Sequence, residues 1–172
     1  MAFKVVTTGF MGRPADTRYE NEGLAPLGTS IQVIEANDED AYIAQVKDAD
    51  AIIGGRFALN AKVINALEKC KVIGTAGVGV DRIDLDAATA RGIVVTNVPD
   101  VFIEEVSVHA MMLLLCCAKK TIPLDRAVRE NRWRDSRKYM SPMPRVVGDT
   151  LGLVAFGNIP KLVAKKAKGF DM

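Results

Sequence analysis

The sequence predicts an α/β protein whose first part is a doubly wound parallel sheet. Three observations support this prediction. Short β-branched runs recur along residues 1 to about 100, helical stretches alternate with them, and the connections between them are short. This βαβ rhythm is typical of parallel strands that are joined by helices and covered on both faces.

The strands and helices of this first part are expected in a definite order. The predicted strands are Phe3–Thr8, Ile31–Glu35, Ala51–Gly54, Val72–Thr75 and Ile93–Thr96. The predicted helices are Asp38–Lys47, Ala61–Lys69 and Asp84–Arg91. Because crossovers between parallel strands are right-handed, this order makes a flavodoxin-like unit of about 100 residues, the usual size of one domain.

A second part is expected to begin after the segment Asn97-Val-Pro-Asp. Pro99 interrupts the pattern, and Asp100 can cap the next helix. Ile103–Lys119 lacks a polar stripe beyond its first turn, which is typical of a helix packed between two bodies, so we expect it to join two domains. The elements predicted after it are a helix from Pro123 to about Arg132, a surface arm over Arg134–Arg145, a strand over Leu151–Phe156 and a helix over Asn158–Gly169.

The predicted strand Leu151–Phe156 raises a question of pairing. Its nearly continuous apolar run is typical of a strand in the middle of a parallel sheet, buried on both faces. No later strand is predicted in this sequence, and a strand left at an edge exposes unpaired backbone groups. We therefore expect this segment to be covered by a second copy of the chain or to be poorly ordered.

Composition and charge argue against several classes of partner. The formal net charge is +2, from 23 basic and 21 acidic residues, so neither nucleic acid nor an anionic membrane is expected to bind. The N-terminus lacks the features of a signal peptide, and the longest apolar run, Ala110–Ala118, is too short to span a bilayer. These features predict a cytoplasmic location. A cluster of lysines near the end is expected on the solvated face of a helix: Lys161, Lys165, Lys166 and Lys168.

The three cysteines are Cys70, Cys116 and Cys117. Their odd number and irregular spacing predict neither a disulfide framework nor a zinc site, and no metal is expected. Cys116 and Cys117 lie in an apolar run and are therefore expected to be inert core thiols.

The first glycine-rich loop, Gly74-Thr-Ala-Gly-Val-Gly-Val-Asp81, directly follows a predicted strand. In an open parallel sheet, ligands bind beyond the carboxyl ends of the strands. If Gly77 and Gly79 adopt positive φ, their backbone N–H groups can form a nest that holds a small carboxylate. The same spacing also fits a tight turn without a ligand, so both interpretations stay open.

The second loop, Ala155-Phe-Gly-Asn-Ile-Pro160, lies between a predicted strand and a predicted helix, as a dinucleotide fingerprint does. It keeps only the middle glycine, Gly157, which allows the backbone to approach phosphates closely. Ala155 replaces the first glycine, which is a small change if φ stays negative. Pro160 replaces the third glycine and is tolerated in the first helical turn. On its own this loop does not establish nucleotide binding.

Together these residues resemble the D-isomer-specific 2-hydroxyacid dehydrogenase family. The resemblance extends from about Ala51 to the end of the chain. It is densest over Lys71-Val-Ile-Gly-Thr-Ala-Gly-Val-Gly-Val-Asp-Arg-Ile-Asp-Leu-Asp-Ala-Ala-Thr-Ala-Arg-Gly-Ile-Val-Val-Thr-Asn-Val-Pro99. Further stretches that match are Glu105-Val-Ser-Val-His109, Asn131-Arg-Trp133 and Leu151-Gly-Leu-Val-Ala-Phe-Gly-Asn-Ile159. Residues 1–50 fit more loosely.

The resemblance implies two domains and an oxidoreductase that uses NAD. Residues 1–100 would be a flavodoxin-like substrate domain that lacks its C-terminal return segment. Residues 101–172 would be the start of a truncated, incomplete Rossmann NAD-binding domain. The implied reaction is hydride transfer between NAD(H) and a small 2-hydroxy or 2-oxo acid, and the family dimerises through its nucleotide domain, which implies a homodimer.

The resemblance also assigns site residues. The backbone N–H groups of Val78 and Gly79, beside Gly77, would hold the carboxylate of the acid. Arg56 matches a position near the substrate mouth, although an ordinary surface arginine fits equally well. The residues assigned to the cofactor pyrophosphate are Gly157, Asn158 and Ile159, with Ala155 at the first position of the fingerprint.

Several groups of the family are missing or changed. Val108 stands where the family often has an acidic residue before its helix histidine. The family's carboxylate-binding arginine, its glutamate, its acid–base histidine and its ribose-binding acid come after the fingerprint, where only residues 161–172 follow Pro160. We therefore expect no catalytic residue in this chain, no activity from it alone, and weak or absent NAD binding.

His109 is the single histidine and so the ordinary candidate for acid–base chemistry near neutral pH. Glu105 lies four residues earlier, on the same helix face, and could orient it. The alternative is a histidine packed at the domain junction with a satisfied hydrogen bond. The resemblance favours this alternative, because the family's catalytic histidine comes from another segment.

Other functions remain open beside the dehydrogenase. The same scaffold could serve a NAD-binding, corepressor-like regulator without turnover, or the chain could be an inactive fragment. A downstream set of arginine, glutamate and histidine would favour the enzyme.

Overall fold

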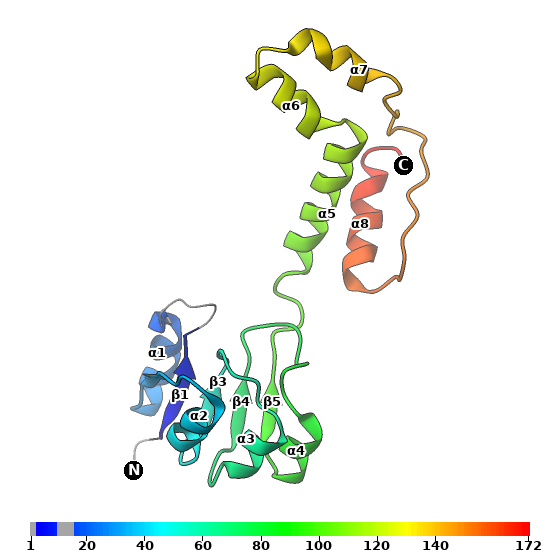
Figure 1. Cartoon of the computed structure of the whole chain (residues 1–172). Coiled ribbons are helices and arrows are strands. Elements are labelled where there is room, and N and C mark those ends of the chain that lie inside the picture. The colour runs from blue at the N-terminus through cyan, green and yellow to red at the C-terminus, as the bar shows by residue number, and fades with distance from the viewer. Residues whose placement is uncertain (1–2, 10–15) are drawn as a thin grey trace. The chain divides into compact units, whose positions relative to one another are not determined.

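The computed structural model describes residues 3–9 and 16–172, which form two compact units (Figure 1). The first unit is Met1–Pro99 and the second is Asp100–Met172. The first holds a sheet with helices, whereas the described residues of the second form helices and irregular segments.

The first unit contains the parallel sheet that the sequence predicts. Its strands are β1 (Val5–Thr8), β2 (Ile31–Ile34), β3 (Ala51–Ile53), β4 (Val72–Gly74) and β5 (Val94–Thr96). They pair in the order β2-β1-β3-β4-β5, and every pair is parallel. This is the flavodoxin-like strand order, so the predicted doubly wound sheet is confirmed.

The predicted helices of the first unit are confirmed as well. They are α2 (Glu39–Val46), α3 (Ala61–Ala66) and α4 (Leu85–Ala90). Each follows a capping residue, Asp38, Asn60 or Asp84, whose side-chain oxygen accepts an N–H of the first turn. Helix α3 ends before its predicted end at Lys69, because Leu67 turns to an extended conformation and is buried in the core.

Two short helices, α1 (Arg18–Leu24) and η1 (Ala25–Leu27), were not predicted. Neither contains a buried residue. Without a buried face they carry no apolar periodicity, which is the signal that reveals a helix in a sequence.

The core of the first unit lies where the helices cover the middle strands. Val6, Ile52 and Ile73, on β1, β3 and β4, have no exposed surface. Buried side chains from the helices and their ends pack in the same cluster: Tyr42, Val46, Val63, Ile64 and Leu67. Burial of one such aliphatic side chain contributes roughly 1.5–3 kcal/mol. This cluster therefore fixes the three middle strands of the sheet, including β4, from which the first glycine loop continues.

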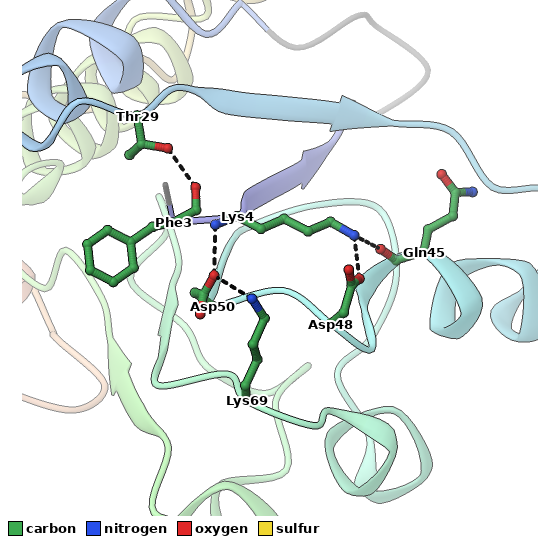
Figure 2. A network of polar contacts seen from close by, with 7 residues as sticks. All are labelled: Phe3, Lys4, Thr29, Gln45, Asp48, Asp50 and Lys69. Atoms are coloured by element: carbon green, nitrogen blue, oxygen red, sulfur yellow. Dashed lines mark hydrogen bonds and ion pairs between the residues drawn. The ribbon is translucent and has the colours of Figure 1, made fainter. Parts of the chain in front are cut away.

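A polar network closes the amino-terminal edge of the sheet (Figure 2). The Asp50 carboxylate accepts the backbone N–H of Lys4 at 2.8 Å and the Lys69 ammonium at 3.0 Å. These two donors hold the pKa of Asp50 below its ordinary value. The Lys4 ammonium pairs with Asp48, whose pKa it lowers, and donates to the Gln45 carbonyl at 2.9 Å.

The second unit is organised around α5 (Ile103–Ala118) and α8 (Asn158–Lys168), which pack together. Met111 from α5 and Val163 and Ala167 from α8 are buried in their contact. The remaining helices are α6 (Thr121–Arg129), η2 (Trp133–Ser136) and α7 (Arg137–Met140). The predicted arm over Arg134–Arg145 is therefore partly helical, although most of its side chains are exposed.

Lys166 corrects the prediction of a solvated lysine face. Its ammonium donates to Glu104 Oε1 and to Ser107 Oγ, both at 2.8 Å. Ser107 has no exposed surface, and its hydroxyl donates to the Glu104 carbonyl at 2.7 Å. A buried hydroxyl needs partners, and Lys166 on α8 supplies one. The other three lysines of the predicted face are exposed, as expected: Lys161, Lys165 and Lys168.

The predicted strand Leu151–Phe156 is wrong. The segment forms no strand, and Leu151 and Leu153 pack on the α5–α8 cluster instead. Val154 is 99% exposed and Phe156 is 62% exposed. A strand exists through its pairing, and no described residue of the second unit forms a strand to which this segment could pair. Apolar composition alone therefore misidentified an extended segment laid on two helices.

The thiols also differ from expectation. Cys70 is buried, and burial raises its pKa. Cys116 is only half-buried and Cys117 is exposed, so they are not core thiols. Helix α5 packs on α8 through part of its surface, and Cys117 lies outside that part.

Within the residues described, no single helix is long and apolar enough to cross a membrane, whereas α5 and α6 reach that length and composition when taken together, with a bend of 64° between them.

Candidate functional site

The carboxyl ends of β1, β3, β4 and β5 place four segments on one edge of the sheet. They are Thr8, the Gly54–Arg56 loop, the Gly74–Val80 loop and the Thr96–Val98 segment. Strand β1 connects to β2 on one side and pairs with β3 on the other, so the direction of winding reverses between β1 and β3. Ligands of open α/β sheets bind at such a reversal.

The Gly74–Val80 loop is held by the chain that follows β5. The N–H of Val98 donates to the Gly77 carbonyl at 3.1 Å, and the Asn97 side-chain amide donates to the Val78 carbonyl at 2.7 Å. At the base of the loop, the N–H of Gly77 donates to Thr75 Oγ1 at 3.2 Å. These bonds fix the orientation of two successive peptide planes.

Two backbone donors follow from this orientation. In a planar trans peptide the N–H points opposite to the carbonyl. Because the Gly77 and Val78 carbonyls both turn toward the Asn97–Val98 segment, the N–H groups of Val78 and Gly79 both point away from it. Among the described residues neither N–H has an acceptor, and Val78 is 47% exposed. The loop thus offers two parallel donors, a geometry that suits one carboxylate.

The expected nest of positive-φ glycines is wrong. Neither Gly77 nor Gly79 has positive φ. The donor pair comes instead from carbonyls anchored on one side of the loop. Glycine suits position 79 because of the space there rather than its φ, since a Cβ would lie 2.9 Å from the Asp81 carboxylate.

The positive-φ glycines of this edge lie in the β3 loop. Gly54 has φ 46° and Gly55 has φ 137°, and the N–H of Arg56 next to them donates to Thr8 Oγ1 at 2.7 Å. The sequence analysis missed Thr8 and both glycines. A Gly-Gly pair directly after a predicted strand was the signal that could have revealed them.

Arg56 is exposed, and its immediate surroundings are ordered. Its carbonyl accepts a hydrogen bond from the Arg82 guanidinium. Its own guanidinium lies 5.6 Å from the centre of the Phe57 ring. Phe57 stacks on the buried Tyr42 with ring centres 4.7 Å apart. Burial raises the pKa of Tyr42, so this phenol stays neutral and serves packing.

The second loop lies in the second unit and ends at the N-terminus of α8. Gly157 caps the helix with extended backbone, and a Cβ there would meet no atom within 4 Å. The first-turn N–H groups of Asn158 and Ile159 have no acceptor in the part of the chain that the structure describes. Such free donors, together with the helix dipole, favour an anion.

Ala155 departs from the sequence expectation. It was predicted to be tolerated with negative φ, but its φ is 68°. The first position of the fingerprint therefore has a left-handed conformation that glycine adopts without strain and alanine does not.

His109 is exposed on α5. Within the described residues it has neither an ion pair with Glu105 nor another hydrogen bond, so both the oriented base and the satisfied hydrogen bond expected from the sequence are absent there. The described residues also contain no group of three His, Cys, Asp or Glu side chains placed to hold a metal ion.

Comparisons with known proteins agree on one family. Residues 14–168 match the model for "D-isomer specific 2-hydroxyacid dehydrogenase, catalytic domain". The chain is 35% identical over 150 residues to D-3-phosphoglycerate dehydrogenase of Mycobacterium tuberculosis, a match that covers 86% of this chain and 28% of that protein. It is 39% identical over 132 residues to glyoxylate reductase of Korarchaeum cryptofilum, covering 76% of this chain and 40% of that protein. The chain thus spans well under half the length of either relative.

The fold agrees as well. The crystal structure of D-lactate dehydrogenase from Aquifex aeolicus, complexed with NAD and lactic acid, superposes with a TM-score of 0.79. The match covers 98% of this chain and 49% of that enzyme, at 24% identity, and shows that the fold is shared. From the family match and the two relatives we conclude that the chain belongs to the D-isomer-specific 2-hydroxyacid dehydrogenase family.

Proposed function

We propose that this chain is the N-terminal part of an oxidoreductase that transfers hydride between NAD(H) and a small 2-hydroxy or 2-oxo acid. The observation that carries the proposal is the pair of free N–H groups at Val78 and Gly79, at the edge of the sheet where ligands bind. Relatives named for oxidising phosphoglycerate or reducing glyoxylate support it, because both names denote chemistry on such acids.

Residues 1–100 would form the substrate domain. The N–H groups of Val78 and Gly79 would hold the acid's carboxylate, and the Gly77 carbonyl, held by the Val98 N–H, would orient the first of these donors. Arg56, exposed at the same edge of the sheet and held by its neighbours, would add a cation that attracts and orients the acid.

Residues 101–172 would begin the NAD-binding domain. The N-terminus of α8 fits a pyrophosphate, since the N–H groups of Asn158 and Ile159 are free and Gly157 presents no side chain that would block an approaching phosphate. When bound, NAD supplies or accepts the hydride. Ala155 would shape the turn in front of Gly157. The proposal keeps the cytoplasmic location expected from the sequence.

The proposed assembly is a homodimer through the second unit. Apolar side chains on α5 and α6 are exposed: Val106, Val108, Met112, Leu113 and Ile122. Three of them, Met112, Leu113 and Ile122, line a hollow of about 480 Å³ between α5 and the start of α6. Exposed apolar surface of this kind marks an interaction site, and a second copy would cover it. The alternative of a corepressor-like regulator gains no support from the two relatives, which are both named as enzymes.

The test is a titration of the ¹⁵N-labelled chain with glyoxylate. The amide signals of Val78 and Gly79 should shift. Asn97→Ala releases the Val78 carbonyl and should weaken binding about tenfold, the effect of losing one good hydrogen bond. Asn37→Ala, at an exposed asparagine, is the matched control and should bind as the wild type does. Shifts confined to other parts of the chain would contradict the proposed carboxylate site.

A further inference from the structure

We infer that Thr8 is a positioning residue for the acid site, acting through the peptide of Arg56. The inference rests on the proposed function, because Arg56 matters only if an acid binds at this edge of the sheet. Thr8 is not proposed to contact the acid; its hydroxyl accepts the backbone N–H of Arg56 and so fixes the loop that carries the arginine.

The contact joins two strands at the reversal of winding. Thr8 is the last residue of β1 and is 6% exposed. Its Oγ1 accepts the N–H of Arg56, three residues after the end of β3, at 2.7 Å. Beyond the end of a strand this N–H has left the sheet ladder, so it needs an acceptor from elsewhere. The buried hydroxyl provides it.

Gly55 shows that the loop and the hydroxyl fit each other. A Cβ at position 55 would lie 2.4 Å from Thr8 Oγ1 and 3.5 Å from Thr8 Cβ. The φ of 137° at Gly55 also lies in a region that side chains rarely adopt. Glycine is therefore required twice: for its conformation, and because the hydroxyl fills the place of its missing side chain.

The remaining groups of Arg56 are held as well. Its carbonyl accepts from Arg82, and its guanidinium lies over Phe57, which stacks on Tyr42 in the core. An exposed arginine held at its N–H, its carbonyl and its side chain loses less conformational freedom when it binds an anion. Thr8 is the partner whose bonding group is a buried side-chain hydroxyl on β1. Removing only this hydroxyl should loosen Arg56 and leave the strand pairing of the sheet intact.

The first test compares Thr8→Val, which removes the hydroxyl and keeps the shape, with Thr8→Ser, which keeps the hydroxyl. Thr7→Val is the matched control, since the Thr7 hydroxyl is also buried but bonds only the Thr8 carbonyl, at 3.2 Å. In the full chain, Thr8→Val should speed hydrogen exchange of the Arg56 amide about tenfold and weaken glyoxylate binding by a similar factor. Thr8→Ser and Thr7→Val should change neither by more than about twofold.

The second test uses Gly55→Ala alone and in a Thr8→Ala background. Gly55→Ala should speed exchange of the Arg56 amide, because its Cβ displaces the hydroxyl. In the Thr8→Ala background the hydroxyl is already gone, so Gly55→Ala should add only the effect of its unfavourable φ of 137° and therefore less than it adds in the wild type. This non-additivity is the signature of two groups in contact, and it remains measurable if Thr8→Val folds poorly.

The outcomes separate the inference from the proposed function. A wild-type chain that binds no glyoxylate overturns both. If the wild type binds and Thr8→Val binds equally well, the hydroxyl is merely structural and the inference alone is overturned. Unchanged exchange of the Arg56 amide in Thr8→Val, or additive effects of the two alanine substitutions, overturn it too.

Discussion

At the scale of single residues, backbone conformation separates what the sequence reveals from what it hides. The sequence pointed to Gly77 and Gly79 for positive φ, whereas the structure puts it at Gly54 and Gly55. A glycine can adopt positive φ without a steric cost, and the hydrogen bonds of the surrounding chain decide whether it does. Here hydrogen bonds from Asn97 and Val98 set the conformation of the Gly74–Val80 loop, and a bond to Thr8 sets that of the Gly54–Arg56 loop. Such partners are distant in sequence, so local motifs cannot show them.

Ala155 carries a prediction at this scale. Alanine with φ 68° is strained, so Ala155→Gly should raise the free energy of unfolding of the second unit by about 1 kcal/mol. This value is a net gain, because glycine also has more conformational freedom than alanine in the unfolded chain, which offsets part of the relieved strain. Thermal and urea unfolding are the measurements. Gly157→Ala is the reverse comparison: Gly157 is the N-cap of α8, where alanine is less favourable than glycine, so this change should lower the free energy of unfolding by about 0.5–1 kcal/mol. A less stable Ala155→Gly chain would show that the strain is absent.

At the scale of elements, the sequence predicts helices and strands that have a periodic apolar pattern, and it fails for segments that lack one. The strands of the sheet and helices α2, α3, α4, α5, α6 and α8 were predicted, although α6 begins and ends earlier than expected, because a buried helix face repeats in the sequence and a capping residue marks where a helix begins. Helix α1 buries nothing and left no pattern. The segment Leu151–Phe156 was apolar without being a strand, because side chains at 151 and 153 pack on helices rather than in a sheet.

The contact between α5 and α8 gives a second prediction. Ser107→Ala removes a buried hydroxyl that bonds both the Glu104 carbonyl and the Lys166 ammonium. The free energy of unfolding should fall by about 1–2 kcal/mol. Ser136→Ala, at a less buried serine that also bonds a backbone carbonyl, should change it by less than about 0.5 kcal/mol. Equal effects of the two substitutions in urea unfolding would mean that Lys166 does not depend on the serine.

At the scale of the whole molecule, charge and surface decide how the chain behaves in solution. The polar network at the amino-terminal edge makes stability depend on pH in the acid range, and the apolar face of the second unit favours association. Neither property could be predicted from net charge or from hydrophobic content. Both depend on which side chains the fold brings together or leaves uncovered.

The acid prediction concerns Asp48 and Asp50, whose pKa values are held below the ordinary value of 3.8. A group with a lowered folded pKa stabilises the fold above its unfolded pKa. That contribution is lost as pH falls through the folded value, so stability should decline below about pH 4. Urea unfolding at several pH values between about 2.5 and about 6 measures this decline in stability. Asp50→Asn should be less stable at pH 6 and show a flatter decline, and a parallel decline would exclude Asp50 as a source.

Association is the prediction for the second unit. Leu113 is 49% exposed on α5, so Leu113→Glu should shift the chain toward monomer in light scattering at micromolar concentration. Leu27→Glu is the control, since Leu27 is 62% exposed in the first unit and should leave the assembly unchanged. A wild-type chain that is monomeric throughout would contradict the proposed homodimer.

Catalysis by this chain alone gives the last prediction. Its single histidine is exposed on α5 with no orienting carboxylate among the described residues, so NADH oxidation with glyoxylate should stay at background. Calorimetry should likewise detect weak NAD binding or none. Turnover that His109→Ala abolishes would reverse this reading of the histidine.

The two peptides that present the N–H groups of Val78 and Gly79 are also bonded to the segment by which the chain leaves the first unit. Their carbonyls are bonded to Val98 and Asn97, immediately before Pro99, where that unit stops. A hydrogen bond at one end of an amide polarises it and strengthens the bond at the other end. An acid seated on the loop would therefore stiffen the departing chain, and the amide of Val98 would exchange more slowly with solvent. Binding of an acid at the carboxyl ends of the strands would then be detectable as reduced mobility of the segment 97–99, which leads out of the first unit.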